Sequence, residues 1–533
     1  MSRSATRRRS ALALLAAGSV LATVACGSTV QQSGATALGG AQQVPGAVDQ
    51  GLTPVGPDGL ALDPSGVAGG TATDGGSSVG AALGASSSGS TGSSGSLGSS
   101  GVPGGSAQQP GSSGAGSAGG GATAAAAGPV GPGVTDKEIR IGLGFCNDCA
   151  GANAALGAGG DDPGDTRRYY QAALDDVNSR GGVLGRKLVP VFHEVSASDN
   201  IDTSAQAACE RWTSDSKVLM MVFRSEIVYQ CAAKAGALAQ GAGGTGPVFE
   251  KYPGMFAPAT VRLERLYDVT VKAMVRAGWH KPEPRWPTGK IGLITWDNND
   301  YRFAMKNGYL KAMGQAGLKA EEVRYVAVPQ SANSIADASA AVSNAVLSFR
   351  EKGIDHVFIG DGPAGIFAGV GLTFLFLSNS NSQGYKPRYG FNSNNGPNFA
   401  SHPKEQLVGM VAIDSFSITP VADQGMALNP QRERCWNLMK KRGLQARPGL
   451  TGNTAIIACD AAWFAEAILE KAQATALPRL IAAGEALGTS YHSPYNYGNR
   501  LGPGQHDGVA LFRNLQWDTG CSCNKYTSKP YEP

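Results

Sequence analysis

The sequence predicts an α/β protein built of two doubly wound parallel-sheet lobes. Segments patterned as strands and helices alternate through roughly the last 400 residues, which is typical of parallel sheets covered by helices on both faces. The alternation occurs in two successive series of similar size. A chain of that length also exceeds one typical domain, so two are expected.

The N-terminus predicts an export signal over residues 1–25. Arg7, Arg8 and Arg9 precede a short apolar run, and small residues follow up to Cys26. The apolar run is too short for a membrane span, which needs roughly 20 residues. The small residues before Cys26 resemble a bacterial lipobox, although Thr23 stands where Leu is usual. This resemblance implies that Cys26 is lipidated and that the protein is anchored on the extracytoplasmic face of the cell membrane. The alternative is a plain secretory signal with an incidental cysteine.

Residues 26–135 predict a disordered tether. After Cys26 the segment consists mainly of Gly, Ser, Ala and Pro and contains no Lys, Arg or aromatic residue. Such a composition cannot bury enough apolar surface to offset the entropy of ordering the chain. A flexible coil of about 110 residues reaches on the order of 55–60 Å root-mean-square.

The first series of elements begins with a strand at residues 138–145. The helix expected at 166–180 carries its apolar residues on one face, and two glycines follow it as in many helix ends. The series continues with strands at 187–195, 218–223 and 247–252 and helices at 203–212 and 227–237.

The second series has the same pattern. It comprises helices at 261–277, 301–316, 335–352 and 366–377 and strands at 290–296, 323–328, 356–359 and 389–392. Three helices, at 431–442, 454–474 and 478–487, and a strand at 509–517 complete the chain.

Three segments carry a resemblance to a known family. Residues 169–188 include the run Gly-Gly-Val-Leu-Gly-Arg-Lys-Leu, and residues 292–301 and 353–360 hold two further matching strands. Over about 136–517 the chain resembles type I periplasmic solute-binding proteins, most closely the leucine/isoleucine/valine-binding group. The resemblance implies a hinge of three crossings, with the ligand between the lobes. It places 136–258 plus 417–502 in lobe one and 259–416 plus 503–533 in lobe two.

Candidate ligand-binding residues follow the expected strands, because parallel sheets bind ligands beyond the carboxyl ends of their strands. Ser225 can hold an anion at a helix N-terminus, or merely cap that helix. A capping role is also the alternative for Asn299. The full set is Asn147, Ser225, Glu226, Asp297, Asn299, Tyr301, Asp361, Asn392 and Asn394.

The loop after residue 392 bears on the class of ligand. It holds Asn and Ser, whereas amino-acid-binding relatives commonly carry an acidic residue near this point to pair the ammonium group. An unpaired ammonium in a closed cleft is costly. Unless Glu226 or Asp361 replaces that acid, an α-amino acid is disfavoured, and an amide, a small acid or a polyol remains open.

Other functions find little support in the sequence. Gly360–Gly365 fits a dinucleotide fingerprint, but no acidic residue lies near 20 residues further on to hold a ribose. There is no hydrolase or zinc-protease motif, so we expect no enzyme, cofactor or metal. The net charge is only +4 and no basic tract occurs beyond the signal, so we expect no nucleic-acid partner.

Eight cysteines follow Cys26. In an exported protein they favour disulfides. We expect Cys209–Cys231 and Cys435–Cys459, each closing a loop of about 25 residues and contributing roughly 3 kcal/mol. The pairing of Cys146, Cys149, Cys521 and Cys523 stays open, because a Cys-x-Cys bridge is strained and cross-pairing is an alternative.

These observations lead to an expected function. The protein captures a small polar molecule, of the amino acid, amide or small-acid class, and delivers it to the permease subunits of an ABC importer. The alternative is a ligand-sensing or carrier protein of the same fold that acts with a different membrane partner.

Overall fold

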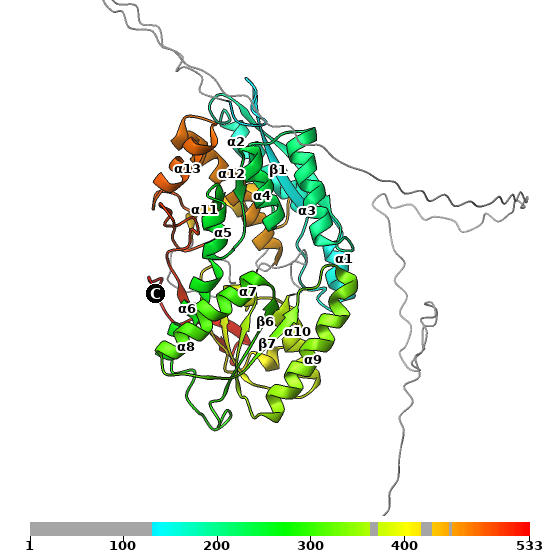
Figure 1. Ribbon diagram of the computed structural model, residues 1–533, viewed down its shortest axis with the longest axis vertical. Helices are drawn as coiled ribbons and strands as arrows, with labels where there is room; N and C mark the ends of the chain where they lie inside the picture. The colour runs from blue at the N-terminus through cyan, green and yellow to red at the C-terminus, as the bar shows by residue number, and fades with distance from the viewer. Residues whose placement is uncertain (1–129, 363–370, 417–428, 447–449) are drawn as a thin grey trace, which may run out of the picture. The chain divides into compact units, whose positions relative to one another are not determined.

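A computed structural model describes residues 130–362, 371–416, 429–446 and 450–533. All of them belong to one compact unit, residues 116–533. The signal at 1–25, the lipidation site Cys26 and nearly all of the tether lie outside the described residues. Within them the chain forms two α/β lobes, shown above and below one another in Figure 1. This confirms the predicted fold class.

Lobe one contains a five-stranded sheet in the order β2-β1-β3-β4-β5, and every neighbouring pair is parallel. The strands are β1 (Glu138–Cys146), β2 (Lys187–Val195), β3 (Met220–Val222), β4 (Leu238–Gln240) and β5 (Met255–Phe256). The strand predicted at 247–252 is wrong, since this segment forms helix α5 (Gly246–Lys251). Its proline lies in the first helical turn, where the fixed φ of proline favours a helix start.

Helices cover both faces of this sheet. Met220 and Leu238 face a core that includes α2 (Thr166–Ser179), α12 (Leu450–Ala472) and α13 (Leu477–Ala486). The next residue of each strand turns to the opposite core, which includes α3 (Ile201–Glu210) and α4 (Glu226–Ala235). Successive side chains of a strand point to opposite faces of the sheet, so each strand packs against helices on both faces. The remaining helical segments of the lobe are α1 (Cys149–Ala155), α11 (Pro430–Lys441) and the π-helical η1 (Arg211–Asp215).

Lobe two contains a seven-stranded sheet in the order β12-β11-β10-β9-β8-β6-β7. Its strands are β6 (Ile291–Asp297), β7 (Ala320–Ala327), β8 (His356–Gly360), β9 (Arg388–Asn392), β10 (Val411–Asp414), β11 (Arg513–Asp518) and β12 (Cys523–Tyr526). One strand of this sheet runs opposite to its neighbours, because β11 is antiparallel to both β10 and β12. The connection between β11 and β12 is too short for a parallel crossover, which needs a dozen or more residues.

The helices of lobe two form two groups around the sheet (Figure 1). One consists of α9 (Ile335–Glu351) and α10 (Leu372–Ser382). The other contains α6 (Leu263–Arg276), α7 (Asn299–Ala304) and α8 (Lys311–Gln315), with the π-helical η2 (Met305–Leu310) interrupting the helix predicted at 301–316. Short 3-10 turns occur at η3 (Ala332–Ser334), η4 (Ser393–Asn395) and η5 (Lys404–Gln406). In the part of the chain that the structure describes, no helix is both long and apolar enough to cross a membrane.

The segments that pass between the lobes contact one another. Ala257 bridges Asp507, and Phe416 bridges Asn496. The buried carboxylate of Asp507 accepts hydrogen bonds from the guanidinium of Arg265, at 2.9 and 2.6 Å. These contacts join the described segments that pass between the lobes into one hinge.

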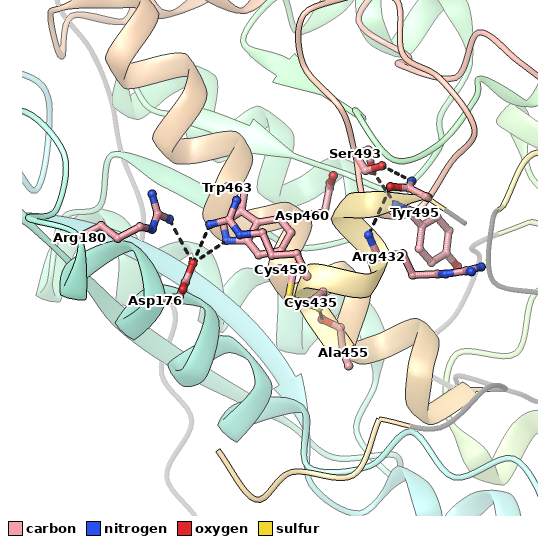
Figure 2. The surroundings of a disulfide bond; sticks show 12 residues. Asp176, Arg180, Arg432, Cys435, Ala455, Cys459, Asp460, Trp463, Ser493 and Tyr495 are labelled. Atoms are coloured by element: carbon pink, nitrogen blue, oxygen red, sulfur yellow. Dashed lines mark hydrogen bonds and ion pairs between the residues drawn. A yellow bond between two sulfur atoms is a disulfide. The ribbon is translucent and has the colours of Figure 1, made fainter. Parts of the chain in front are cut away.

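Four disulfides are present among the described residues. Cys209–Cys231 joins α3 to α4 and Cys435–Cys459 joins α11 to α12, as expected from the sequence. Both cysteines of the second bond are fully buried, and Figure 2 shows this bond near Asp176, whose carboxylate pairs with Arg180. The four remaining cysteines pair locally, as Cys146–Cys149 and Cys521–Cys523, so cross-pairing is excluded.

Candidate ligand-binding site

A cavity of about 330 Å³ lies between the two lobes. Residues at the carboxyl ends of β1, β3 and β4 line it from lobe one, and residues following β8, β9 and β10 line it from lobe two. Its size falls at the lower end of the roughly 300–1,000 Å³ typical of small-molecule pockets. The polar side chains that line it include Arg224, Gln240, Asp361, Thr373, Ser393, Asn394, Asn395, Asn398, His402, Asp414, Asn453 and Asp460.

Two of the nine predicted ligand-binding residues, Asp361 and Asn394, line this cavity. Seven lie outside the lining: Asn147, Ser225, Glu226, Asp297, Asn299, Tyr301 and Asn392. The cavity therefore forms at the sheet edges that the sequence predicted. Most of the side chains predicted to bind the ligand do not line it.

The residues of lobe one that lie outside the lining have local roles or face solvent. Ser225 caps α4 by accepting a hydrogen bond from the backbone N–H of Ile227 at 3.2 Å. Glu226 pairs with Lys251 at 2.9 Å, and this contact lowers the pKa of the carboxyl group. Asn147 is exposed beyond the end of β1.

The residues of lobe two show the same pattern. Asp297 accepts a hydrogen bond from Arg302 at 2.5 Å, and Tyr301 is buried in the lobe core. Asn392 is also buried, and its amide donates to the Tyr309 hydroxyl at 3.1 Å. Asn299 is exposed, while its neighbour Asn298 caps α7.

Two buried carboxylates of lobe two are enclosed by protein donors. Asp361 accepts hydrogen bonds from the indole N–H of Trp296, the backbone N–H of Gly362, and the backbone and hydroxyl of Thr373, at 2.8–3.2 Å. Burial raises the pKa of Asp361, and these hydrogen bonds oppose the rise. Asp414 accepts from four donors at 2.6–3.1 Å, namely Ser393, Tyr497, Tyr526 and the backbone of Phe416. The negative charge of each carboxylate is therefore stabilised by hydrogen bonds from the protein itself.

A third carboxylate, Asp460, projects from the middle of α12 in lobe one. It is 1% exposed and accepts from the Gln240 amide at 2.9 Å and the Tyr491 hydroxyl at 2.8 Å. Burial raises the pKa of Asp460 to about 6, against the opposing effect of hydrogen bonds that include one with Ser493. This carboxylate is therefore held by neutral donors.

Arg224 supplies the positive charge of the cavity wall. It follows β3, lines the cavity and is exposed. Within the described parts of the chain its guanidinium makes no hydrogen bond and no ion pair. Burial raises the pKa of Tyr170 to about 12, and the positive charge of Arg224 partly offsets this rise. Burial also raises the pKa of Tyr495, and Arg224 again has the opposite effect. Arg224 thus lies near two aromatic hydroxyls of the cavity wall.

Several polar atoms of the wall lack protein partners. Among the described residues, the Gln240 Oε1, Asn398 Nδ2, His402 Nδ1 and Asn453 Oδ1 atoms are buried without a hydrogen bond. Burial lowers the pKa of His402 to about 4, so its imidazole is neutral at pH 7. An unsatisfied buried polar group costs about 1–3 kcal/mol. A bound polar molecule would offset that cost.

Much of the rest of the wall is apolar and rich in aromatic rings. It comprises Phe145, Tyr170, Val195, Ile201, Val222, Phe223, Phe374, Phe399, Phe416, Leu450, Ile457 and Tyr495. The cavity therefore combines an apolar surface with a few separate polar positions, as small-molecule sites commonly do.

Direct contacts hold the lobes together at the cavity. The buried Asp161 of lobe one accepts hydrogen bonds from the backbone N–H groups of Ala400 and Ser401 in lobe two, at 3.0 and 3.2 Å. Two backbone bonds of 3.1 Å also cross the lobes, from Ile201 to Gln330 and from Ala332 to Ala197. We call these contacts the latch. They show a closed arrangement of the lobes.

Sequence reasoning missed most of the cavity wall. Arg224 immediately precedes Ser225, in the loop that was singled out, and Gln240 and Asp414 end short strands that were not predicted. The sequence around Asp460 contains a feature that could have identified it as a candidate residue. It is an acid in the apolar helical run Ala-Ile-Ile-Ala-Cys-Asp-Ala-Ala-Trp-Phe, where a charge is unusual.

Comparison with known structures supports the fold. The chain is similar to a fatty acid ABC transporter substrate-binding protein from Thermomonospora curvata, with a TM-score of 0.52, 16% identity, and coverage of 76% of this chain and 95% of that one. It is also similar to a solute-binding protein of Rhodopseudomonas palustris BisB5 in complex with 3,4-dihydroxybenzoic acid (TM-score 0.53, 16% identity, coverage 74% and 97%). A third similar structure is a branched-chain amino acid ABC transporter protein from Thermus thermophilus with bound valine. Its TM-score is 0.52 at 14% identity, and the match covers 74% of this chain and 97% of that one.

No protein-family model and no curated protein matches the sequence. The structural likeness shows that the chain has the type I periplasmic binding protein fold, as the sequence resemblance implied.

Proposed function

We propose that this protein is an extracytoplasmic solute-binding protein, which captures a small molecule between its lobes and delivers it to an ABC importer. The observation that carries the proposal is the cavity of about 330 Å³, which both lobes line and whose wall holds buried polar atoms without partners. Closure of two lobes around a ligand is a known hinge motion of such folds. The names of the similar structures, each an ABC transporter protein, support the importer as the partner.

The protein binds its ligand without changing it chemically. The three carboxylates of the cavity wall accept hydrogen bonds from protein donors. These hydrogen bonds hold the carboxylates in place, which preorganises the wall for binding. Binding is therefore the role that this wall supports.

In this proposal a lipid on Cys26 holds the protein at the outer face of the cell membrane, and residues 27–135 serve as a tether. The support is the sequence alone, since Cys26 and nearly all of the tether lie outside the described structure. A Cys26→Ser variant is expected to move from the membrane fraction to the soluble fraction and to lose incorporation of a labelled fatty acid. Continued membrane attachment and labelling of the variant would contradict the anchor.

The binding function is tested on the purified full chain with its disulfides intact. Native mass spectrometry before and after unfolding and refolding should reveal a solute that is lost on unfolding. Thermal unfolding of the stripped protein against amino acids, amides, small acids, polyols and sugars should then show stabilisation. A ligand at 100 times its Kd adds about 2.7 kcal/mol. Stabilisation by no compound, together with no co-purified solute, would refute the proposal. Loss of uptake of the identified solute on gene deletion tests the importer.

A further inference from the structure

We propose that the ligand is an apolar carboxylic acid whose carboxylate pairs with Arg224 and whose hydrocarbon body contacts the aromatic wall. This inference rests on the proposed binding function and names the class of ligand. It is narrower than the amino acid, amide or small-acid range that the sequence left open.

The charge of the wall supports an anionic group on the ligand. Arg224 has no hydrogen-bonding or ion-pairing partner in the described residues, whereas Asp361 and Asp414 each accept from at least four protein donors. A ligand that fills the cavity removes water from the guanidinium, and a charge that loses water needs a counter-charge. A carboxylate matches the planar donor fork of arginine in a bidentate pair.

Among the described residues of the wall, no carboxylate is as open to an ammonium group as Arg224 is to an anion. Asp460 is the remaining carboxylate, and it lies near Tyr170 and Tyr495, as Arg224 does. Its two oxygens accept from Gln240 and Tyr491, and Ser493 adds a further hydrogen bond. Both oxygens of this carboxylate already have donors and the residue is 1% exposed, so an ammonium gains less there than a carboxylate gains at Arg224, which is exposed and unpaired among the described residues.

The apolar part of the wall defines the remainder of the ligand. Phenyl or tyrosyl rings come from both lobes, including Phe145, Phe223 and Tyr170 from lobe one and Phe374 and Phe399 from lobe two. Aromatic side chains supply large apolar contact areas, which favour contact with an aromatic ring or a hydrocarbon chain of the ligand. The volume of about 330 Å³ suits a compact acid rather than a long chain.

The test uses four probes with one phenylalkyl body: 3-phenylpropionate, 3-phenylpropionamide, phenethylamine and phenylalanine. Calorimetry on the stripped full chain measures the Kd of each. We expect 3-phenylpropionate to bind at least tenfold more tightly than the amide, the amine or the amino acid. Equal binding of acid and amide would overturn the inference. Tighter binding of phenylalanine would also overturn it and would identify Asp460 as an ammonium partner.

Substitution locates the pairing. Arg224→Gln should weaken 3-phenylpropionate at least tenfold and leave the amide within twofold, because only the charged pair is lost. Arg211→Gln is the matched control, since Arg211 is an exposed arginine of lobe one that lies outside the lining. Unchanged acid binding by Arg224→Gln would refute the assignment. If only sugars or polyols bind, this inference fails while the binding function stands; if nothing binds, the binding function itself fails.

Discussion

The latch predicts that one side chain controls lobe closure. Among the described residues, the Asp161 carboxylate makes hydrogen bonds only to the other lobe, through the backbone N–H groups of Ala400 and Ser401. Hydrogen bonds to a charged group contribute about 1.5–3 kcal/mol each, so Asp161→Ala removes about 3 kcal/mol from the closed form at the lower value. Since 1.4 kcal/mol is a factor of ten, the opening equilibrium should rise roughly a hundredfold.

Hydrogen exchange measures this opening without a ligand. The informative amides are those of Ile201 and Ala332, which bond across the lobes but do not contact Asp161. In Asp161→Ala their exchange should accelerate roughly a hundredfold, provided that the latch opens as one unit. Asp162→Asn is the control, because its exposed carboxylate accepts from Gly164 within lobe one. Unchanged exchange at Ile201 and Ala332 would refute the reasoning and show that each contact opens independently.

Three further predictions concern stability. Replacing Cys435 and Cys459 by Ser should lower the free energy of unfolding by about 3 kcal/mol, measured in urea, because the disulfide closes a chain of 24 residues. Asp460→Asn should remove a pH dependence. Burial raises the pKa of Asp460 to about 6, above the value of about 3.9 in an unfolded chain. The folded protein thus binds more protons between about pH 4 and 6, and its stability falls across that window as pH rises, by on the order of 2 kcal/mol. Arg265→Met should cost about 3–5 kcal/mol in urea, because it leaves the buried Asp507 carboxylate without its cation.

The three stability predictions are checked by control variants and by the outcomes that would contradict them. Replacing Cys521 and Cys523 by Ser should change stability little, since their disulfide spans only two positions. An equal loss in both variants would contradict the loop argument. Asp460→Asn that keeps the wild-type pH profile would assign the titration to another group. Arg276→Ala, an exposed change on the same helix as Arg265, should cost less than 1 kcal/mol. An equal cost would show that the hinge pair is not special.

The sequence predicted long elements well and very short ones poorly. The strand expected at 187–195 has those limits in the structure, because it carries nine residues of pattern. β4 and β10 have three and four residues, all buried, so they offer no alternation to recognise. Conversely, the segment at 247–252 is apolar enough for a strand, but the proline beside Gly246 begins a helix.

The sequence predicted the sheet edges that form the cavity but few of the side chains that line it. A polar residue after a strand can face the cavity or cap the next helix, and sequence alone does not separate these uses. Ser225 and Asn392 cap, whereas Asp361 and Asn394 line the cavity. Asp460 was beyond the strand-end rule, because a helix carries it to the cavity from a distant part of the chain.

The path of the chain through lobe one has a consequence for how the protein is assembled. Helix α12 completes the core that α2 begins, and Arg180 bonds Glu466 across 286 residues of sequence. Synthesis from the N-terminus therefore produces all of β6 to β10 before lobe one can close its core. Contacts between such distant segments fold slowly. The core of lobe one therefore stays incomplete in the nascent chain until α12, which begins at Leu450, has been synthesised.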